Sequence, residues 1–166
     1  VEAVFEQLRG VTNVVSGFSG GNKLTAHYEV VSTGMTGHAE SVEVTYDPAQ
    51  ISYRQLLDVY FTVAHDPTEL DYQGPDHGSQ YRSSIFYIGD EQKKVAEAAI
   101  RDLTAKHVYS APIVTKVVPF VAFYPAEAYH QHYLVRHPDE AYIVYNDMPK
   151  LKALHEHFPA LLKAHT

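Results

Sequence analysis

A glutamate near the start of an alternating segment is well placed for acid–base chemistry. Residues 39–46 read Ala-Glu-Ser-Val-Glu-Val-Thr-Tyr, which is the alternation of a half-buried β-strand. A period of two puts Glu40 on the same face as the apolar side chains of this strand. A carboxyl group in such a place can have a raised pKa and act as a general acid near neutral pH. The alternative is a strand that begins at Ser41 and leaves Glu40 in water, where most glutamates lie.

A second group of polar side chains lies in a long segment between two apolar stretches. Residues 68–79 are polar and contain Gly74-Pro75-Asp76-His77-Gly78, so the sequence predicts a loop. A loop this long in a compact domain usually has a function. The alternative for Asp76 is a side chain that only hydrogen-bonds its own turn.

The eleven histidines raise the possibility of a metal site. His130 and His132 are two residues apart, and so are His155 and His157. On a helix, residues two apart point to different faces, whereas shared ligation needs a spacing of three or four. No HExxH motif occurs, so we expect surface and loop histidines and no metal.

Composition excludes several classes of function. The chain has 166 residues, 45% of them hydrophobic, which suits a single domain over residues 1–166. The net charge is −7 and the basic residues are scattered, which argues against nucleic acid as a partner. No apolar run is long enough to span a membrane, and no signal peptide is visible. We expect a soluble monomer and leave cytoplasm and periplasm both open.

The first residues predict a helix over Val1–Arg9, with apolar side chains at i, i+3, i+4 and i+7 and a terminating glycine at Gly10. No capping residue and no Met precede this helix. We therefore expect a chain truncated at its N-terminus. It also contains no Cys, so it can form neither a disulfide nor a thiolate metal site.

The remaining pattern predicts strands interspersed with helices. Ser52-x-x-Gln55 is a capping box that opens one helix, and Asp90 is a candidate cap for the next. Residues 17–21 predict a flexible glycine-rich turn. The best architecture is an α+β two-layer sandwich, ferredoxin-like, with helices packed on a mixed, largely antiparallel sheet. The predicted strands are 11–16, 28–32, 39–46, 83–88 and 113–118, and the predicted helices are 52–63, 90–106, 126–136 and 148–162 with an interruption at Pro159.

Three stretches together resemble the A-type peptide methionine sulfoxide reductases: residues 34–40 (Gly-Met-Thr-Gly-His-Ala-Glu), 73–83 (Gln-Gly-Pro-Asp-His-Gly-Ser-Gln-Tyr-Arg-Ser) and 123–131 (Phe-Tyr-Pro-Ala-Glu-Ala-Tyr-His-Gln). Residues 42–48 and 65–67 fit the same family. The resemblance covers about residues 1–145 in order. One stretch alone would be weak, but all of them at matching spacing are specific.

The resemblance implies that a Gly-Cys-Phe-Trp-Gly motif stands directly before Val1, and that its Cys is the nucleophile. The N-terminal strand and this motif would then be missing, and the chain without them is predicted to be inactive. The expected chemistry is attack of a thiolate on the sulfoxide sulfur while an acid protonates the oxygen. A cysteine at a helix N-terminus has a lowered pKa, which suits a nucleophile just upstream of Val1.

The resemblance also assigns roles to residues of this chain. Glu40 matches the family's general acid, and Tyr28 and Tyr81 match tyrosines that hydrogen-bond the sulfoxide oxygen. Phenolic groups can donate to developing negative charge without carrying charge themselves. Asp76 matches an acid that orders the site. With thirteen tyrosines in the chain, ordinary amphipathic packing is the alternative for either Tyr.

The substrate pocket is expected to include Phe18 and His77. Phe18 departs from the family, in which a Tyr is common at that place, and the missing hydroxyl can alter local hydrogen bonding. Ala128 is a second departure, at a position where an Asp is frequent.

The expected activity is reduction of methionine S-sulfoxide, free or in proteins, as repair of oxidative damage. No resolving Cys occurs in the C-terminal segment, where many relatives have one. If only the nucleophile is missing upstream, the resemblance implies a single-cysteine enzyme recycled by an external thiol such as thioredoxin, with no bound cofactor. The alternative is a resolving Cys upstream of Val1. The alternative is a binding module that holds methionine sulfoxide or oxidised protein without turnover. We expect no nucleotide site, because residues 17–21 lack a phosphate-binding glycine pattern.

Overall fold

The computed structural model describes residues 2–20, 39–70, 72–73, 76–77, 81–126 and 148–163. The predicted strand 28–32, and the predicted helix 126–136 beyond Ala126, lie outside these residues. The chain divides into two compact units. The first comprises Val1–Ser16, Val42–His65 and Pro125–Thr166, and the second comprises Gly17–Ser41 and Asp66–Tyr124.

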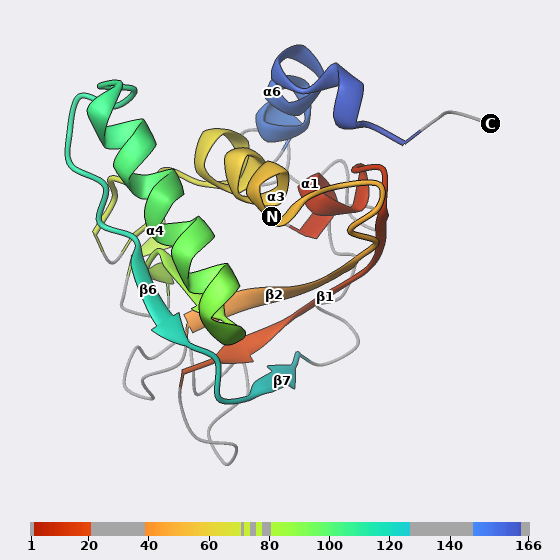
Figure 1. The fold of residues 1–166 in the computed structure, drawn as a ribbon, viewed down its shortest axis with the longest axis horizontal. Coiled ribbons are helices and arrows are strands. Elements are labelled where there is room, and N and C mark those ends of the chain that lie inside the picture. Colours follow the sequence, from red (N-terminus) through yellow and green to blue (C-terminus); the bar gives the residue numbers. More distant parts are fainter. Residues whose placement is uncertain are drawn as a thin grey trace. The chain divides into compact units, whose positions relative to one another are not determined.

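The elements follow one another as helices and strands in mixed order (Figure 1), which agrees with the predicted α+β class. The strands are β1 (Val11–Ser19), β2 (Ala39–Tyr46), β3 (Tyr72–Gln73), β4 (Asp76–His77), β5 (Ser84–Tyr87), β6 (Lys116–Pro119) and β7 (Phe123–Pro125). The helices are α1 (Glu2–Glu6), α3 (Tyr53–Val59), the π-helical turn η2 (Tyr60–Ala64), α4 (Gly89–Ala105), α6 (Met148–His157) and the 3-10 turn η6 (Pro159–Leu161).

Strand β1 is the middle strand of a sheet of order β2-β1-β7. The amide of Asp47, just after β2, donates to the carbonyl of Gly10, just before β1, at 2.7 Å. Since the end of β2 meets the start of β1, these two strands run antiparallel. The other pairs of strands are β3 with β4, which is antiparallel, and β5 with β6, which is parallel.

The first unit has a core formed by one face of each of its helices and by the start of β1. Leu8 and Leu154 are fully buried there, and α6 contacts both α1 and η2. The core residues are Val4, Phe5, Leu8, Val11, Val14, Ile51, Leu56, Val59, Val63, Ala64 and Leu154.

Helix α1 ends earlier than predicted. It stops at Glu6, whereas the apolar stripe predicted a helix to Arg9. Leu8 forms a β-bridge with Leu162 instead, and the amide of Arg9 donates to the carbonyl of Leu161 at 2.7 Å. Pairing with a segment distant in sequence thus replaces the last helical turn.

The predicted capping box at Ser52 is confirmed. Ser52 Oγ accepts from the amide of Gln55 at 3.1 Å, and Gln55 Oε1 accepts from the amide of Ser52 at 2.9 Å. The helix then widens into η2, after which His65 Nδ1 lies 2.8 Å from the carbonyl oxygen of Tyr60. A carbonyl oxygen can only accept, so Nδ1 carries the proton.

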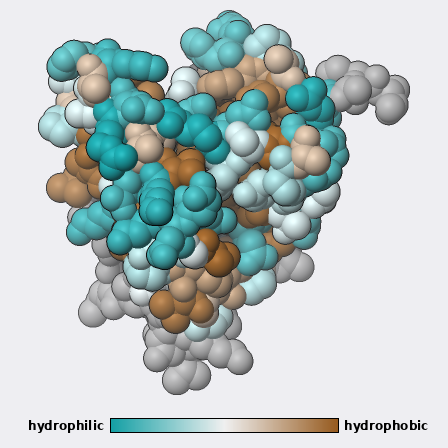
Figure 2. Space-filling view, viewed as in Figure 1, coloured by the Kyte–Doolittle hydropathy of each residue, from teal (hydrophilic) through white to brown (hydrophobic). Residues whose placement is uncertain are grey.

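In the second unit, α4 packs against β5 and β6. Ala96 and Ala99 are fully buried and let the helix approach the strands closely. Figure 2 shows a largely hydrophilic surface over α4, as expected for the outward face of an amphipathic helix. Among the described residues, no helix has the length and apolar character needed to cross a bilayer.

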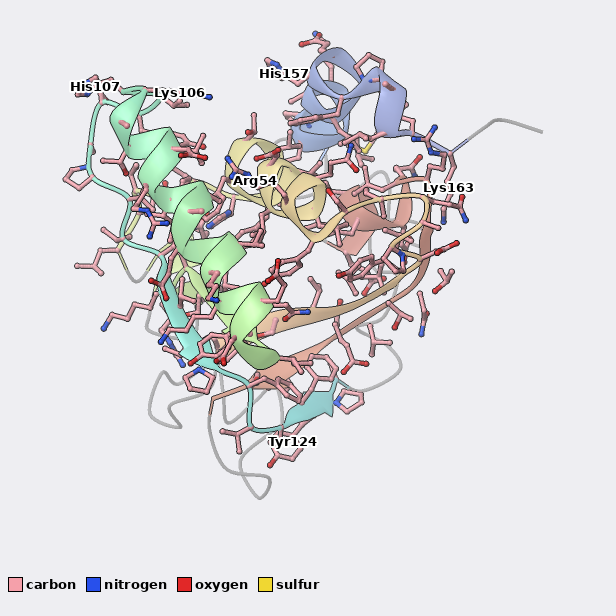
Figure 3. The ribbon with its side chains drawn as sticks, viewed as in Figure 1. Arg54, Lys106, His107, Tyr124, His157 and Lys163 are labelled. Atoms are coloured by element: carbon pink, nitrogen blue, oxygen red, sulfur yellow. The ribbon has the colours of Figure 1, made fainter. Side chains whose placement is uncertain are left out.

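The ends of α4 differ from the prediction. Ile88, not Asp90, is the N-cap residue, and Asp90 lies in the first turn. At the other end His107 has a φ of 51°, and its amide and that of Val108 donate to the carbonyls of Thr104 and Leu103 (Figure 3). This is the Schellman arrangement, in which a residue with positive φ ends a helix.

Three segments that were predicted as irregular contain strands. Residues 17–19 continue β1 and are buried, so the predicted flexible turn does not begin at Gly17. The predicted loop 68–79 contains the β3–β4 pair, and β7 was not predicted. Each of these strand segments is only two or three residues long, which is too short for an alternating pattern to appear in the sequence.

We predict that Gly10→Ala destabilises the protein by roughly 2–4 kcal/mol, from a left-handed backbone and steric overlap together. Gly10 has a φ of 88°, and an added Cβ would lie 2.8 Å from Gln50 Cβ and 3.0 Å from Ile51 Cγ2. Gly89 is a matched control because its φ is 80° but nothing lies within 4 Å of an added Cβ. Urea unfolding should show a much smaller loss for Gly89→Ala. Equal losses would contradict the steric part of this explanation.

A second prediction concerns Tyr53, whose pKa is raised to about 12 by burial and, second, by Tyr46. An unfolded Tyr ionises near pH 10. As pH rises, the Tyr53 phenol therefore loses its proton in the unfolded chain before it does so in the folded one. The free energy of unfolding that Tyr53 contributes is fully present below pH 10 and is lost as pH rises toward 12. Unfolding free energies measured between pH 9 and 11 should fall less steeply for Tyr53→Phe than for the parent. Identical slopes would show that Tyr53 is not shielded from water.

Candidate functional site

The candidate site residues that the structure describes all belong to the second unit. Phe18 lies in β1, Glu40 in β2, Asp76 and His77 in β4, and Tyr81 follows β4. For Asp76 and His77 the description covers the backbone. Tyr28 lies outside the described residues.

Glu40 is the second residue of β2 and is half-buried. From Val42 to Tyr46 the predicted alternation is confirmed, since Val42 and Val44 are half-buried and Glu43 is exposed. At the start of the strand it is not, because Ser41, on the face predicted to be polar, is half-buried as well. The strand begins at Ala39 and not at Ser41, as the alternative required, and Ala39 is fully buried. Glu40 is therefore a carboxyl group inside a strand, partly withdrawn from water. Its role as the general acid stays a prediction.

Phe18 is nearly completely buried, with 2% of its surface exposed. The next residue, Ser19, is equally buried, and its Oγ donates to the carbonyl of Ala122 at 2.6 Å. This hydrogen bond connects the end of β1 to the residue just before β7. Strand β7 contains Tyr124 (Figure 3). Phe18 thus belongs to the packed interior of the second unit. Its role in a substrate pocket stays a prediction.

The segment that carries Asp76 and His77 is fixed at its start by Asp66. The Asp66 carboxylate accepts from the amide of Thr68 at 2.9 Å and from its hydroxyl at 2.6 Å. Pro67 is fully buried, and its carbonyl accepts from the amide of Val114 at 2.8 Å. The Asp66 carboxylate also adds to the effect of burial in raising the pKa of Tyr109.

Side-chain and backbone hydrogen bonds fix the same segment at its end. Ser83 is buried, its Oγ lies 2.6 Å from Thr115 Oγ1, and its carbonyl accepts from the amide of Lys116 at 3.1 Å. Both ends of the segment are therefore held by residues 114–116. Tyr81 lies two residues before Ser83 and is half-buried.

One residue of this segment with a distinctive pair of hydrogen bonds was not singled out from the sequence. Gln73 binds the backbone of Asp66 at two points, with Oε1 3.1 Å from the amide nitrogen and Nε2 3.0 Å from the carbonyl oxygen. The sequence contains Gln73 in one of the stretches that carry the resemblance, but a single glutamine gives no sign of its partner.

The structure brings no metal-binding group together within the residues it describes. His155 and His157 are exposed in the last turn of α6 (Figure 3), while His130 and His132 lie outside the described ranges. What the second unit offers instead is a half-buried carboxyl group, a half-buried phenol and an anchored two-strand hairpin. Groups of this kind suit acid-assisted chemistry on a polar group, and their common role stays a prediction.

The chain matches the family model for peptide methionine sulfoxide reductase over residues 1–161. It is 55% identical over 161 residues to peptide methionine sulfoxide reductase MsrA 2 of Mesorhizobium japonicum, covering 97% of this chain and 83% of that protein. It is 49% identical over 162 residues to the MsrA of Thermus thermophilus, and the match covers 98% of this chain and 90% of that protein.

Solved structures agree. Mxr1 from Saccharomyces cerevisiae in reduced form superposes with a TM-score of 0.73 at 34% identity, covering 79% of this chain and 74% of that one. Methionine sulfoxide reductase A of Corynebacterium diphtheriae gives a TM-score of 0.70 at 34% identity, and the match covers 82% of this chain and 69% of that one. The α+β sandwich class is thereby confirmed. The chain belongs to the A-type peptide methionine sulfoxide reductase family.

Proposed function

We propose that this chain belongs to an oxidoreductase that reduces methionine S-sulfoxide, free or in proteins, with thiols as the reductant. The observation that carries the proposal is the family match over residues 1–161. The half-buried position of Glu40 in β2 supports it, because the reaction needs a proton donor at the sulfoxide oxygen.

The proposed reaction has two stages. A cysteine thiolate attacks the sulfoxide sulfur, and Glu40 protonates the sulfoxide oxygen. The substrate S–O bond breaks, the hydroxyl is transferred to the cysteine sulfur and the S–S bond between cysteine and substrate breaks. The products are methionine and a cysteine sulfenic acid. Two external thiols, such as those of reduced thioredoxin, then return the sulfenic acid to a thiol and release a disulfide and water. The sulfoxide is reduced, two thiols are oxidised, and no bound cofactor is needed.

The other proposed roles support this step. Tyr28 and Tyr81 donate hydrogen bonds to the sulfoxide oxygen as negative charge develops on it. Asp76 orders the site, and Phe18 and His77 contribute to the substrate pocket.

A second candidate function rests on composition, because the 166-residue chain contains no Cys. Without a comparable soft nucleophile, this chain alone would bind methionine sulfoxide and release it unchanged. The two candidates differ in whether turnover appears once the nucleophile is supplied.

The test compares the chain with one extended at its N-terminus by Gly-Cys-Phe-Trp-Gly. Each is incubated with a dithiol and with the S or R epimer of N-acetyl-methionine sulfoxide amide. We expect the extended protein alone to produce the thioether, and only from the S epimer. A folded but inert extended protein would disprove the reductase proposal and leave the binding module.

In the extended protein, we predict that Glu40→Gln lowers kcat by roughly 10²–10⁴-fold, which is the usual contribution of a general acid. The matched control is Glu43→Gln, which alters the same strand at an exposed position. The control should keep the parent kcat and the same thermal midpoint. Equal kcat values for the two variants would remove Glu40 from the role of acid.

A further inference from the structure

The Gln73 side chain binds the backbone of Asp66 in a way that the proposed reaction does not by itself require. Its carboxamide accepts from the Asp66 amide and donates to the Asp66 carbonyl, at 3.1 and 3.0 Å. A pair of hydrogen bonds with opposite directions fixes both the position and the orientation of a side chain. We call this pair of bonds the Gln73 clasp.

Gln73, which forms the clasp, is paired directly with a candidate site residue. In the β3–β4 pair, Gln73 faces Asp76 and Tyr72 faces His77. Each strand has only two residues, and an isolated two-stranded hairpin is marginal at best. The position of β4 therefore depends on contacts from outside the pair, and the Gln73 clasp supplies one through β3.

The partner of the clasp is itself fixed. The Asp66 carboxylate accepts hydrogen bonds from the amide and the hydroxyl of Thr68. The following residue, Pro67, is buried, and its carbonyl accepts a hydrogen bond from the amide of Val114. A connected series of contacts thus runs from residue 114 to Asp76. Val114 is hydrogen-bonded to Pro67, Pro67 is covalently joined to Asp66, Asp66 is hydrogen-bonded to Gln73, and Gln73 is paired with Asp76 in the ladder.

We propose that Gln73 is a positioning residue that holds Asp76 and His77 in place for the reaction by clasping the Asp66 backbone. This inference rests on the proposed function. It assigns to Gln73 no contact with the substrate, and it predicts that the geometry of the clasp matters more than the presence of a polar side chain.

The chemistry of the clasp selects glutamine. Gln73→Glu keeps the size of the side chain, but an ionised carboxylate can only accept, so it loses the bond to the Asp66 carbonyl and places two acceptors together. Gln73→Ala removes both bonds. A matched control is Gln50→Ala, because Gln50 Nε2 donates to the Asp47 side chain at 3.0 Å, in an exposed turn of the first unit.

The clasp is tested without catalysis by amide hydrogen exchange in the 166-residue chain. In Gln73→Ala we expect faster exchange at Asp66, whose amide donates to Gln73, and unchanged exchange at Val114 and Lys116. Unchanged exchange at Asp66 would overturn the proposal. Loss of protection at all three amides would also overturn it, because Gln73 would then serve general stability.

Its role in positioning is tested by kinetics of the extended protein. We expect Gln73→Ala and Gln73→Glu each to lower kcat roughly 10- to 100-fold with little change in KM, since small misplacements of site groups have effects of this size. Gln50→Ala should keep the parent kcat. Parent-like kcat in both Gln73 variants would overturn the positioning role. Inactivity of the unmutated extended protein would instead refute the proposed function, while the exchange at Asp66 still decides the clasp.

Discussion

Burial along β1 is the constraint on which the rest of the structure depends. This strand of nine residues lies between β2 and β7, and both of the compact units draw on it. Val11 and Val14 belong to the core of the first unit, whereas Gly17, Phe18 and Ser19 are consecutively buried in the second. Three consecutive buried residues mean that both faces of the strand are covered there. The partly buried strand β2, which carries Glu40, is aligned directly against it.

The elements that could be predicted from sequence are those with local signals. β2 was found with its correct ends because its alternation and the following Asp47-Pro48 are both local, and α3 because Ser52 and Gln55 form a capping box. The early end of α1 depends on Leu162, which lies more than 150 residues away in the chain. β7 and the β3–β4 pair depend likewise on partners, and no sequence pattern indicates the π-helical turn.

The candidate site shows the same division. Strand alternation alone distinguishes Glu40 from Glu43, and the structure agrees, because only Glu43 is exposed. Asp76, His77 and Tyr81 were found through resemblance to a family, since polar residues in a loop give no physical sign of a common task. Gln73 could not be singled out at all, because nothing local in the sequence indicates its two hydrogen bonds to the backbone of Asp66. The anchors at Pro67 and Ser83 were hidden for the same reason.

The central claim is that Glu40, Tyr81 and residues 76–77 bind methionine sulfoxide. The most direct measurement is amide chemical-shift mapping with the extended chain, its cysteine replaced by Ser to prevent turnover, during titration with the S epimer of N-acetyl-methionine sulfoxide amide. The account predicts saturable shifts at Glu40, Tyr81 and residues 76–77, with none in α6. Shifts confined to α6, or no saturable shifts with either epimer, would contradict it.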